Sequence, residues 1–399
     1  MEIRTITKEE RPLVQRLHQY AYGFWSDQDP PEAELDFMIP DETYGVFEKG
    51  QLVTTTSVLN LHQWIRGVRK GMGGISMVAS YPEARRKGYV RSIMLHVFTE
   101  MRKQGLSVTM LEPFRESFYA KFGYVPANSR LTLKAPLQAL RSPTDKQLGS
   151  GWTFERHKAS EVKDAYVDFV LDHATSQFNG FAIRPKFSDV EWTRRNKNCL
   201  MVLVKHNGQV EALARYRIKG YMHFEEPGKM LVIEMHWRSL AAQAALFNYF
   251  SKHQDQVTEI TLRIPYGTDF QPWFIDLPNN VELKSWNPWM VRIIDAEAAL
   301  TYLPVTGSGK VTLGVSDPHC KWNDGIVGLQ AKDQRLKVNG SRKAPDAQLT
   351  IEGLSALLYG THSLEALEYL GWVTKLTKSA RTTLANWFPA QYLYNPLNF

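Results

Sequence analysis

The 399-residue sequence has few of the features that mark secreted or membrane proteins. It contains only two cysteines, Cys199 and Cys320, which lie far apart and suggest no disulfide framework. No apolar run is long enough to cross a bilayer. Residues 1–10 lack the basic and then apolar layout of a signal peptide. We therefore expect a cytoplasmic protein with no membrane segment.

The sequence also lacks the usual signals of nucleic-acid-binding and metal-binding proteins. Its net charge is +7, yet its lysines and arginines form no block and no nucleic-acid motif. Residues 307–310 (Gly-Ser-Gly-Lys) suggest a P-loop, but Val311 stands where that motif needs Ser or Thr. His319 and Cys320 form one pair without a second pair at zinc spacing. We expect neither a nucleic-acid partner nor a bound metal.

What is present indicates a folded protein of several domains. Hydrophobic residues make up 43% of the sequence and aromatic residues 12%, which is typical of packed globular proteins. A length of 399 residues predicts two or three domains. Turn-forming residues gather at 140–152, and the pattern changes again near 286–289. The predicted domains are therefore 1–148, 149–285 and 286–399.

Residues 76–124 carry the most informative pattern. A glycine-rich connection at 66–74 leads to an apolar strand at 75–79, which runs into the basic turn 85–91. The turn opens a helix, so its backbone N–H groups and the positive end of the helix dipole point to one place. Gly88 allows a ligand to approach the backbone closely, and arginine can hold a phosphate with two hydrogen bonds. This order predicts an anion site.

The helix after the turn is predicted from its apolar spacing. Apolar residues recur at i, i+3, i+4 and i+7, which buries one face; they are Val90, Ile93, Met94, Val97, Phe98 and Met101. Gly105 ends the helix, and a short strand at 107–111 follows it.

This unit resembles the core of the GCN5-related N-acetyltransferases (GNAT). Their signature, Arg/Gln-x-x-Gly-x-Gly/Ala, stands at 85–90 as Arg-Arg-Lys-Gly-Tyr-Val, with Val90 in place of the second small residue. The Phe-Tyr-x-x-Phe-Gly-Tyr element at 118–124 is also typical of that family. The resemblance implies acetyl-CoA as co-substrate, with its pyrophosphate at the turn and its pantetheine arm along the strand. The implied contacts are Val78, Ala79, Ser80, Arg85, Arg86, Lys87, Gly88, Tyr89, Val90, Arg91, Phe114 and Arg115.

The remaining two thirds suggest a second, degenerate copy and a different third unit. Residues 159–264 repeat the element order of the first domain, but Arg238 and Ser239 lead directly into a helix without a basic glycine turn. Strands at 313–317 and 325–331 flank the turn-favouring triplet at 323–325 (Asn-Asp-Gly), and this part resembles a sterol-carrier-protein domain. The predicted fold class is α+β with mixed sheets: tandem GNAT-like domains followed by an SCP2-like α+β domain.

These three parts in this order resemble the Eis-type (enhanced intracellular survival) acetyltransferases. The resemblance implies transfer of an acetyl group to a primary amine, either of an aminoglycoside-like or polyamine small molecule or of a lysine. It makes Tyr119 the general acid, since a phenol pKa of about 10 is close to that of a thiol. It makes the terminal carboxylate of Phe399 the base, or an anchor for an ammonium group. It also implies a homo-oligomer, of which hexamers are one form.

The acceptor pocket is predicted from composition near the first helix. Asp27 belongs to an acidic loop at 27–34 that suits a cationic substrate, and Trp25 and Phe37 could supply an apolar wall. One alternative function is open: a lipid or small-molecule carrier that uses the C-terminal domain, with a vestigial first domain. The intact basic turn and Tyr119 favour the enzyme.

Overall fold

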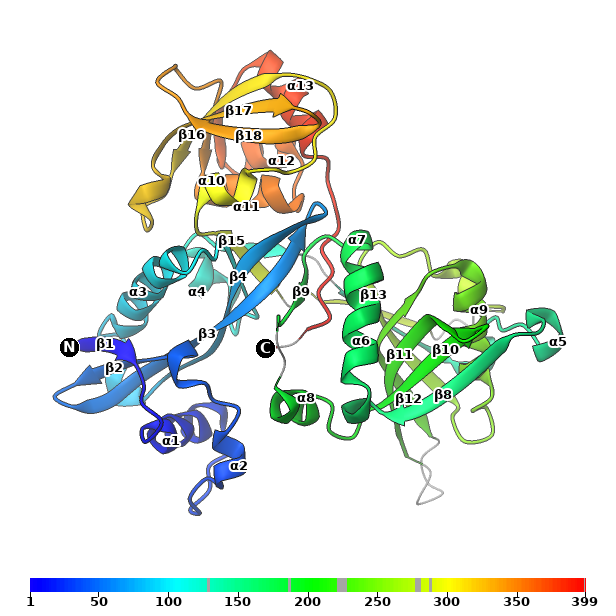
Figure 1. Cartoon of the computed structure of the whole chain (residues 1–399). Coiled ribbons are helices and arrows are strands. Elements are labelled where there is room, and N and C mark those ends of the chain that lie inside the picture. Colours follow the sequence, from blue (N-terminus) through cyan, green and yellow to red (C-terminus); the bar gives the residue numbers. More distant parts are fainter. Residues whose placement is uncertain (128–129, 186–187, 221–227, 277–280, 287–288, 398) are drawn as a thin grey trace.

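Three mixed sheets with attached helices form the chain, which confirms the predicted α+β class (Figure 1). The computed structural model describes residues 1–127, 130–185, 188–220, 228–276, 281–286, 289–397 and 399. Colours in Figure 1 follow the sequence, so most of the first sheet is blue to cyan, most of the second is green, and the third is yellow to red.

The first sheet runs in the order β1-β2-β3-β4-β5-β15-β6, and β9 pairs with β3. Its β4 is antiparallel to β3 and parallel to β5. The elements up to β6 are β1 (Glu2–Thr5), α1 (Arg11–Tyr22), α2 (Glu32–Leu35), β2 (Thr43–Glu48), β3 (Gln51–Ile65), β4 (Val68–Ser80), α3 (Tyr89–Lys103), β5 (Val108–Leu111), α4 (Glu116–Ala120) and β6 (Val125–Ala127).

The predicted helix after the basic turn is confirmed as α3. Its buried face contains Ile93, Met94, Val97, Phe98 and Met101, as the spacing predicts. Val90 is only partly buried, and Tyr89 takes the buried position at the first turn instead.

The predicted connection at 66–74 is wrong, because β4 begins at Val68 and only Arg66 and Gly67 form the turn. The glycines serve close packing inside the strand. A Cβ on Gly73 would lie 2.7 Å from the Met101 side chain of α3. A Cβ on Gly74 would lie 3.0 Å from the ring of Phe399, on the other face. Figure 1 shows α3 on one side of this sheet and the C-terminus on the other.

The second sheet runs in the order β14-β7-β13-β12-β11-β10-β8. Helix α9 covers one face, and the tail of the chain lies against the other. The elements are β7 (Arg130–Pro136), α5 (Asp145–Leu148), β8 (Trp152–Lys158), α6 (Lys163–Phe169), α7 (Thr175–Gln177), β9 (Phe181–Ile183), α8 (Asp189–Arg195), β10 (Leu200–His206), β11 (Gln209–Lys219), β12 (Lys229–Trp237), α9 (Leu240–Ser251), β13 (Glu259–Pro265) and β14 (Glu282–Trp286).

The third sheet runs in the order β18-β17-β16-β19-β20. The elements after residue 288 are β15 (Trp289–Ile293), α10 (Ala296–Leu300), β16 (Lys310–Ser316), β17 (Gly325–Lys332), β18 (Arg335–Gly340), β19 (Ala347–Thr350), α11 (Ile351–Tyr359), α12 (Leu364–Tyr369), β20 (Val373–Leu376) and α13 (Lys378–Trp387).

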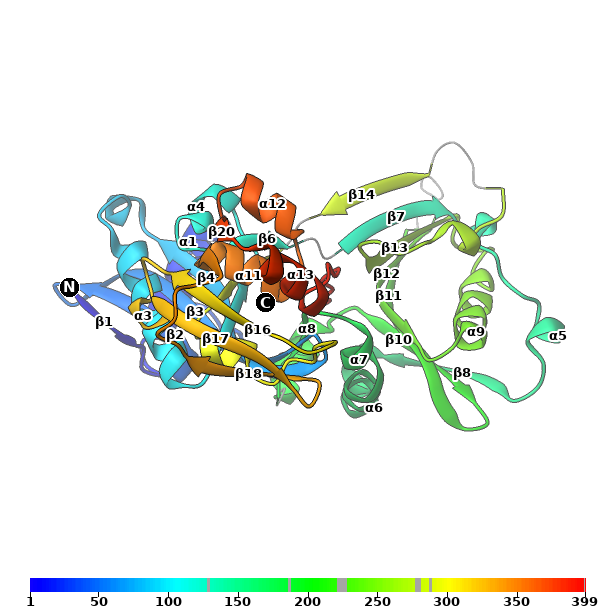
Figure 2. The same cartoon turned by 90° about the horizontal axis from the view of Figure 1, so that it is seen from above.

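The sheets do not follow the predicted divisions at 148 and 286. Strand β7, from the predicted first domain, pairs with β13 and β14 in the second sheet (Figure 2). Strand β15, from the predicted third domain, lies between β5 and β6 in the first sheet. Each strand crosses because its alternating apolar residues fill the core of the neighbouring sheet.

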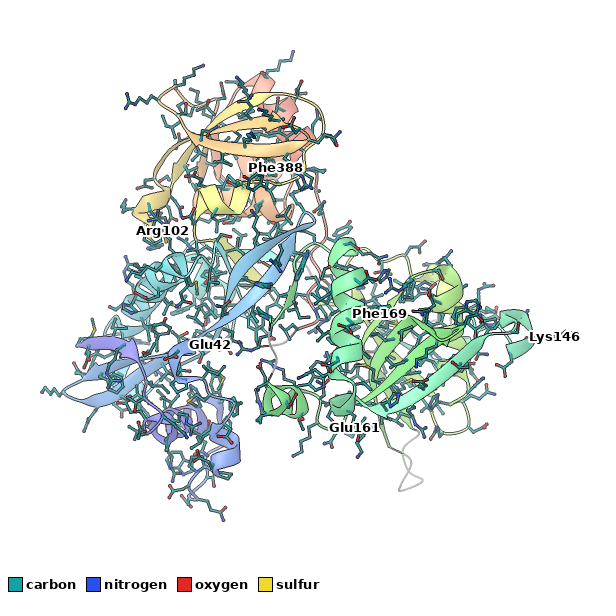
Figure 3. The ribbon with its side chains drawn as sticks, viewed as in Figure 1. Glu42, Arg102, Lys146, Glu161, Phe169 and Phe388 are labelled. Atoms are coloured by element: carbon teal, nitrogen blue, oxygen red, sulfur yellow. The ribbon has the colours of Figure 1, made fainter. Side chains whose placement is uncertain are left out.

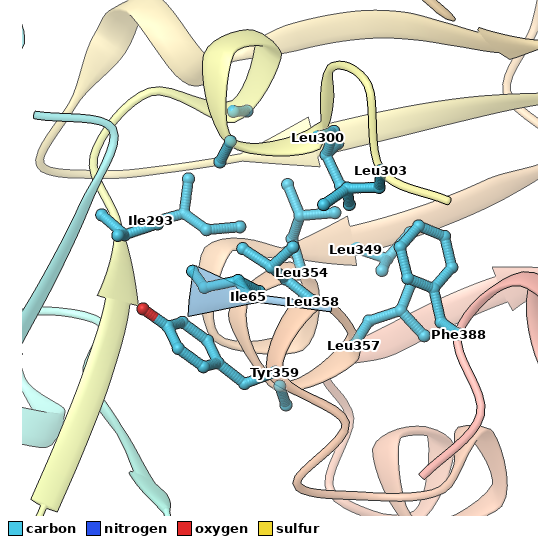
Figure 4. Packing of buried hydrophobic residues seen from close by; sticks show 14 of the residues in the cluster. Ile65, Ile293, Leu300, Leu303, Leu349, Leu354, Leu357, Leu358, Tyr359 and Phe388 are labelled. Carbon is cyan, nitrogen blue, oxygen red and sulfur yellow. The ribbon is translucent and has the colours of Figure 1, made fainter. Parts of the chain in front are cut away.

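The β3–β4 hairpin fixes the first domain to the third. Ile65 lies among Leu354, Leu358 and Tyr359 of α11 (Figure 4). At the hairpin tip, the buried Arg66 donates to the carbonyls of Leu357 and Leu358 at 3.1 and 2.8 Å and to that of Pro389 at 2.9 Å. Two of these bonds go to carbonyls at the C-terminal end of α11, and the third goes to the segment after α13.

The first and second domains also meet through charge. Glu42, labelled in Figure 3, accepts two hydrogen bonds from Arg184 at 2.9 and 2.8 Å. The buried Arg184 also donates to Glu191 at 2.6 Å. The C-terminal tail then runs from the third domain into this junction (Figure 1).

Candidate active site

Strands β4 and β5 separate at one end of the first sheet. They pair from Met72–Ile75 to Val108–Leu111, but β4 continues to Ser80 while the chain after Leu111 turns towards α4. The edge of β4 from Ser76 onward therefore has no β5 partner. The predicted contacts Val78 and Ser80 are partly buried on this free part of β4, and Ala79 is buried against α1.

A bulge in β4 shapes this opening. Met77 has a φ of +54°, and the pairing with β3 shifts between Thr55 and Ser57. The Thr55 hydroxyl donates to the Met77 carbonyl at 3.4 Å, and His18 Nε2 lies 3.1 Å from that hydroxyl. Burial lowers the pKa of His18 to about 4, so the imidazole is neutral at pH 7.

Tyr22, at the end of α1, is a site residue that the sequence analysis missed. Its hydroxyl donates to the Val78 carbonyl at 3.1 Å, on the free edge of β4. Burial raises the pKa of Tyr22 to about 12, so the phenol keeps its proton. No motif marks this residue; only the packing of α1 against β4 brings it here.

The basic turn lies between β4 and α3 and faces solvent. Arg85, Arg86, Lys87 and Arg91 are exposed, and none makes an ion pair within the described part of the chain. Gly88 is the N-cap of α3 with a φ of +84°, and Arg86 also has a positive φ of 63°. No protein atom lies within 4 Å of a Cβ built on Gly88. The turn thus presents free N–H groups, uncompensated cations and open space, which fits a phosphate group.

Tyr119 lies on α4 beside the opening. It is 3% exposed, and its ring packs edge-on against Phe114, Phe118 and Tyr124 at centroid distances of 5.6, 5.1 and 6.1 Å. Burial raises its pKa, and the nearby Tyr22 adds to this shift. Phe114 is 70% exposed and Arg115 is exposed, so both remain available to a ligand.

Phe399 lies on the opposite face of the first sheet. Its ring packs on Trp289 of β15 at a centroid distance of 4.8 Å and lies close to Gly74 of β4. Asn395 holds the preceding turn, because its Oδ1 accepts from Ala182 N at 3.2 Å and its carbonyl accepts from Trp289 Nε1 at 3.3 Å. The chain end is therefore packed at the junction of the first two domains, although no contact joins Phe399 to Tyr119 among the described residues.

The predicted acceptor residues are partly occupied by protein contacts. Trp25 is 58% exposed, and its Nε1 donates to Asp27 at 3.2 Å. The neighbouring Asp29 forms an ion pair with Arg16 at 2.8 Å. The ring of Phe37 lies 3.9 Å from the guanidinium of Arg194 in the second domain. The loop at 27–34 thus carries less free negative charge than its sequence suggests.

Glu112 is a second residue that the sequence analysis missed. It follows Leu111 of β5 at the opening, and strand alternation places it on the face that carries Met110 and the tail. Surrounding protein desolvates its carboxylate and raises its pKa, while the charges of Arg130 and Arg263 act in the opposite direction. The signal was available: Glu112 is the first charged residue after an apolar strand.

The end of α4 is held by residues from outside the first domain. Arg292 Nη1 donates to the Phe122 carbonyl at 2.5 Å, and His319 Nε2 donates to the Lys121 carbonyl at 2.7 Å. Arg292 also forms a buried ion pair with Asp317, with both Oδ–Nη2 distances below 3 Å. These contacts fix Lys121 and Phe122, the two residues that follow α4.

The described part of the second domain lacks a cationic glycine turn between its strand and helix. Strand β12 passes into α9 through Ser239, whose hydroxyl accepts from Ala242 N at 3.2 Å. Where β12 extends beyond its pairing with β13, the fully buried Glu234 accepts from Tyr166 and Arg215 at 2.8 and 2.9 Å. Protein side chains therefore occupy this end of β12.

Among the described residues, no group of three or more His, Cys, Asp or Glu is arranged to hold a metal ion. No helix in the described ranges is both long and apolar enough to span a membrane.

Comparison with known families assigns all three regions. An acetyltransferase (GNAT) domain model matches residues 2–127, and another matches residues 180–293. A sterol carrier protein domain model matches residues 296–395. An uncharacterized N-acetyltransferase of Streptomyces coelicolor is 24% identical over 354 residues, which is 85% of each chain. One from Streptomyces avermitilis is 24% identical over 407 residues, covering 93% of this chain and 94% of the relative.

Solved structures share the whole fold. A GCN5-related N-acetyltransferase from Anabaena variabilis has a TM-score of 0.87 at 16% identity, covering 100% of both chains. Eis1 from Mycobacterium abscessus has a TM-score of 0.81 at 18% identity, also covering 100% of both chains. At these identities the likeness concerns the fold. The chain thus consists of two GNAT acetyltransferase domains followed by a sterol carrier protein domain.

Proposed function

We propose that this protein is an Eis-type N-acetyltransferase that moves an acetyl group from acetyl-CoA to a primary amine of a small molecule or a lysine. The observation that carries the proposal is the coincidence of two features in the first domain: the unpaired cationic turn at 85–91 and the free edge of β4 at 76–80. In the described part of the second domain, which has the same order of elements, β12 leads into α9 without a cationic turn, and Tyr166 and Arg215 bond to Glu234 where β12 extends beyond β13.

Acetyl-CoA fits these residues. The exposed Arg85, Arg86, Lys87 and Arg91 and the N–H groups of the turn would bind its pyrophosphate. The backbone of β4 from Val78 to Ser80 would form hydrogen bonds with the amide groups of the pantetheine arm. Phe114, 70% exposed beside Tyr119, would cover the ligand from the other side.

Tyr119 is proposed as the proton donor to the leaving thiolate. Its burial raises its pKa, so the phenol is protonated at neutral pH. The same shift makes full proton transfer less favourable than from a free phenol. Donation of a short hydrogen bond to the developing thiolate is therefore the main contribution expected from Tyr119.

The terminal carboxylate of Phe399 is proposed to bind the acceptor ammonium and receive its proton through water. The tail is packed rather than frayed, since Asn395 is fully buried and the ring of Phe399 packs on Trp289. A carboxylate at a protein end has a pKa of about 3.5, so it attracts an ammonium group more readily than it deprotonates one.

The carrier alternative finds less support in the third domain. Helix α11 buries Ile351, Leu354, Leu357 and Leu358 at 0–1% exposure against the strands of the third sheet. These side chains fill the interior that a lipid would need.

A thiol-release assay with acetyl-CoA tests the proposal. The acceptor panel contains aminoglycosides, polyamines, lysine and lysine peptides, and a reaction without amine gives the background. Amine-dependent release supports the enzyme and ranks the acceptor classes. Binding of acetyl-CoA without release from any amine would contradict amine acetylation, and absence of binding would contradict the cofactor site as well.

A further inference from the structure

At the junction with the first domain, two arginines of the second sheet have side chains without a partner among the described residues. Arg130 on β7 and Arg263 on β13 lie on neighbouring strands, and Arg130 pairs in register with Pro265. Their strand neighbours Leu131, Leu262 and Ile264 fill the core under α9, so both arginines project from the opposite face. That face carries the C-terminal tail, since Tyr394 is packed there against Phe178.

Neither guanidinium group has a hydrogen-bond or ion-pair partner among the described residues. Arg130 is 8% exposed, and Arg263 is partly buried. Burial and the like charges of Arg130, Arg215 and Arg217 lower the pKa of Arg263. Arg215 differs, because it donates to Glu234 and Asn196 at 2.9 and 3.0 Å. A cation that is largely shielded from water is stabilised by an anionic partner, so this pair of arginines suits an anionic ligand.

This pair of arginines lies near the proposed acyl-transfer site. Met290 pairs with Leu111 and Trp289 with Ala127, so the register places Glu112 beside Trp289 at the same end of the sheet. The ring of Phe399 packs on Trp289, and the charges of both arginines act on Glu112. The carboxylates of Glu112 and the chain end thus place negative charge on one side of this junction. The guanidinium groups of Arg130 and Arg263 place positive charge on the other side.

We propose that Arg130 and Arg263 bind a carboxylate of the acceptor, so that the acceptor is an amine that also carries an acidic group. The inference rests on the proposed function and narrows its substrate class. Arginine pairs with a carboxylate through two parallel hydrogen bonds, and two arginines on adjacent strands offer several such donors. The amine then lies towards Glu112 and the chain end. In the acidic loop at 27–34, Asp29 pairs with Arg16 and Glu32 with Arg11, so the loop contributes less to this selection.

Matched acceptors test the charge requirement. Lysine differs from cadaverine only by its carboxylate, and lysinamide keeps the size of lysine without the charge. The same comparison is made with β-alanine and β-alaninamide, and phosphoethanolamine tests a phosphate in place of the carboxylate. We expect kcat/KM for the carboxylated member of a pair to be about tenfold higher or more, mainly through KM. A preference for phosphoethanolamine over β-alanine, or equal values within each pair, would overturn the carboxylate assignment.

Variants connect the preference to the two residues. Arg263→Gln and Arg130→Gln should lower kcat/KM for the carboxylated acceptor of each pair far more than for the member without an acidic group, so that the preference is lost, and Arg130→Lys should keep part of it. Arg342→Gln, on an exposed arginine of the third domain, is the matched control and should keep the preference. Thermal denaturation of each variant shows whether it is folded. A preference that persists in both glutamine variants would overturn the inference.

Product binding separates this inference from the proposed function. If no amine supports thiol release, the proposed function fails. Calorimetry with Nε-acetyl-lysine and its amide then tests on its own whether the two arginines bind a carboxylate. Tighter binding of the acid, lost in Arg263→Gln, would support an anion site. Equal binding of acid and amide would overturn it.

Discussion

The buried Arg292–Asp317 pair gives the sharpest stability prediction. Both side chains are fully buried, and Arg292 Nη2 lies 2.9 and 2.8 Å from the two carboxylate oxygens. Asp317 also accepts from the backbone N–H groups of His319 and Cys320 at 3.0 Å and from Asn323 Nδ2 at 2.9 Å. Protein donors alone satisfy this carboxylate. Because the pair is buried, removal of the Asp317 charge leaves the Arg292 charge uncompensated in the protein interior.

Asp317→Asn should therefore destabilise the protein by about 3–5 kcal/mol, the usual cost of breaking a buried ion pair. Arg292→Met should cost a similar amount, because it leaves Asp317 charged. The double variant should cost at least ~2 kcal/mol less than the sum of the two, since neither charge is then stranded. Glu368→Gln, in the exposed Arg381–Glu368 pair of the third domain, is the control and should cost less than about 1 kcal/mol.

Urea unfolding, followed by both fluorescence and circular dichroism, measures these differences. The Tyr119 region should respond as well, because Arg292 also binds the Phe122 carbonyl. We expect Asp317→Asn to lower kcat more than it raises KM for acetyl-CoA. A loss of less than 1 kcal/mol, or additive single variants, would refute the reasoning about the buried pair.

Four other residues give compact predictions. Tyr119→Phe should lower kcat at least tenfold without changing acetyl-CoA affinity in calorimetry; unchanged kcat would exclude Tyr119 as the proton donor. Deletion of Phe399 should abolish turnover, and so should one glycine added after Phe399, which keeps the ring but moves the carboxylate; full activity of either variant would contradict the role of the chain end. Arg66→Ala should cost about 3 kcal/mol or more in urea unfolding, because three buried carbonyls lose a charged donor, and a cost below 1 kcal/mol would contradict this account. His18 has a pKa of about 4 when folded against about 6.5 unfolded, so the unfolded chain binds more protons in this range and stability falls as pH drops from 6.5 to 4. His18→Gln should remove about 3 kcal/mol of that loss, measured as the difference between wild type and variant at pH 7 and pH 4, and an equal loss in both proteins would contradict the assignment.

Local patterns were sufficient to predict the elements of the first domain. Helix α3 was predictable because one buried face imposes a 3.6-residue spacing, which Ile93, Val97 and Met101 follow. The cationic turn was predictable because charge and glycine are visible without any tertiary contact.

Predictions from glycine and turn residues were wrong where tertiary packing gives these residues another role. The glycines at 71–74 suggested a connection, but they lie inside β4 because Met101 and Phe399 approach its backbone. The triplet at 323–325 suggested a tight hairpin, yet Asn323 is buried and bonded to Ile294 and Asp317. The two-residue turn occurs instead at Asp333 and Gln334, both with positive φ, between β17 and β18.

Strand exchange explains why the acceptor side of the site could not be predicted from any one domain. Trp289 of β15 lies between β5 and β6 only because the chain returns to the first sheet after completing the second. Arg130 reaches the second sheet only because β7 leaves the first domain, and the tail reaches both through the third. Glu112, Arg130, Arg263 and Phe399 come from four separate segments, so no spacing in the sequence connects them. The proposed cofactor side is local and has a motif, whereas the proposed acceptor side depends on the assembly of all three domains.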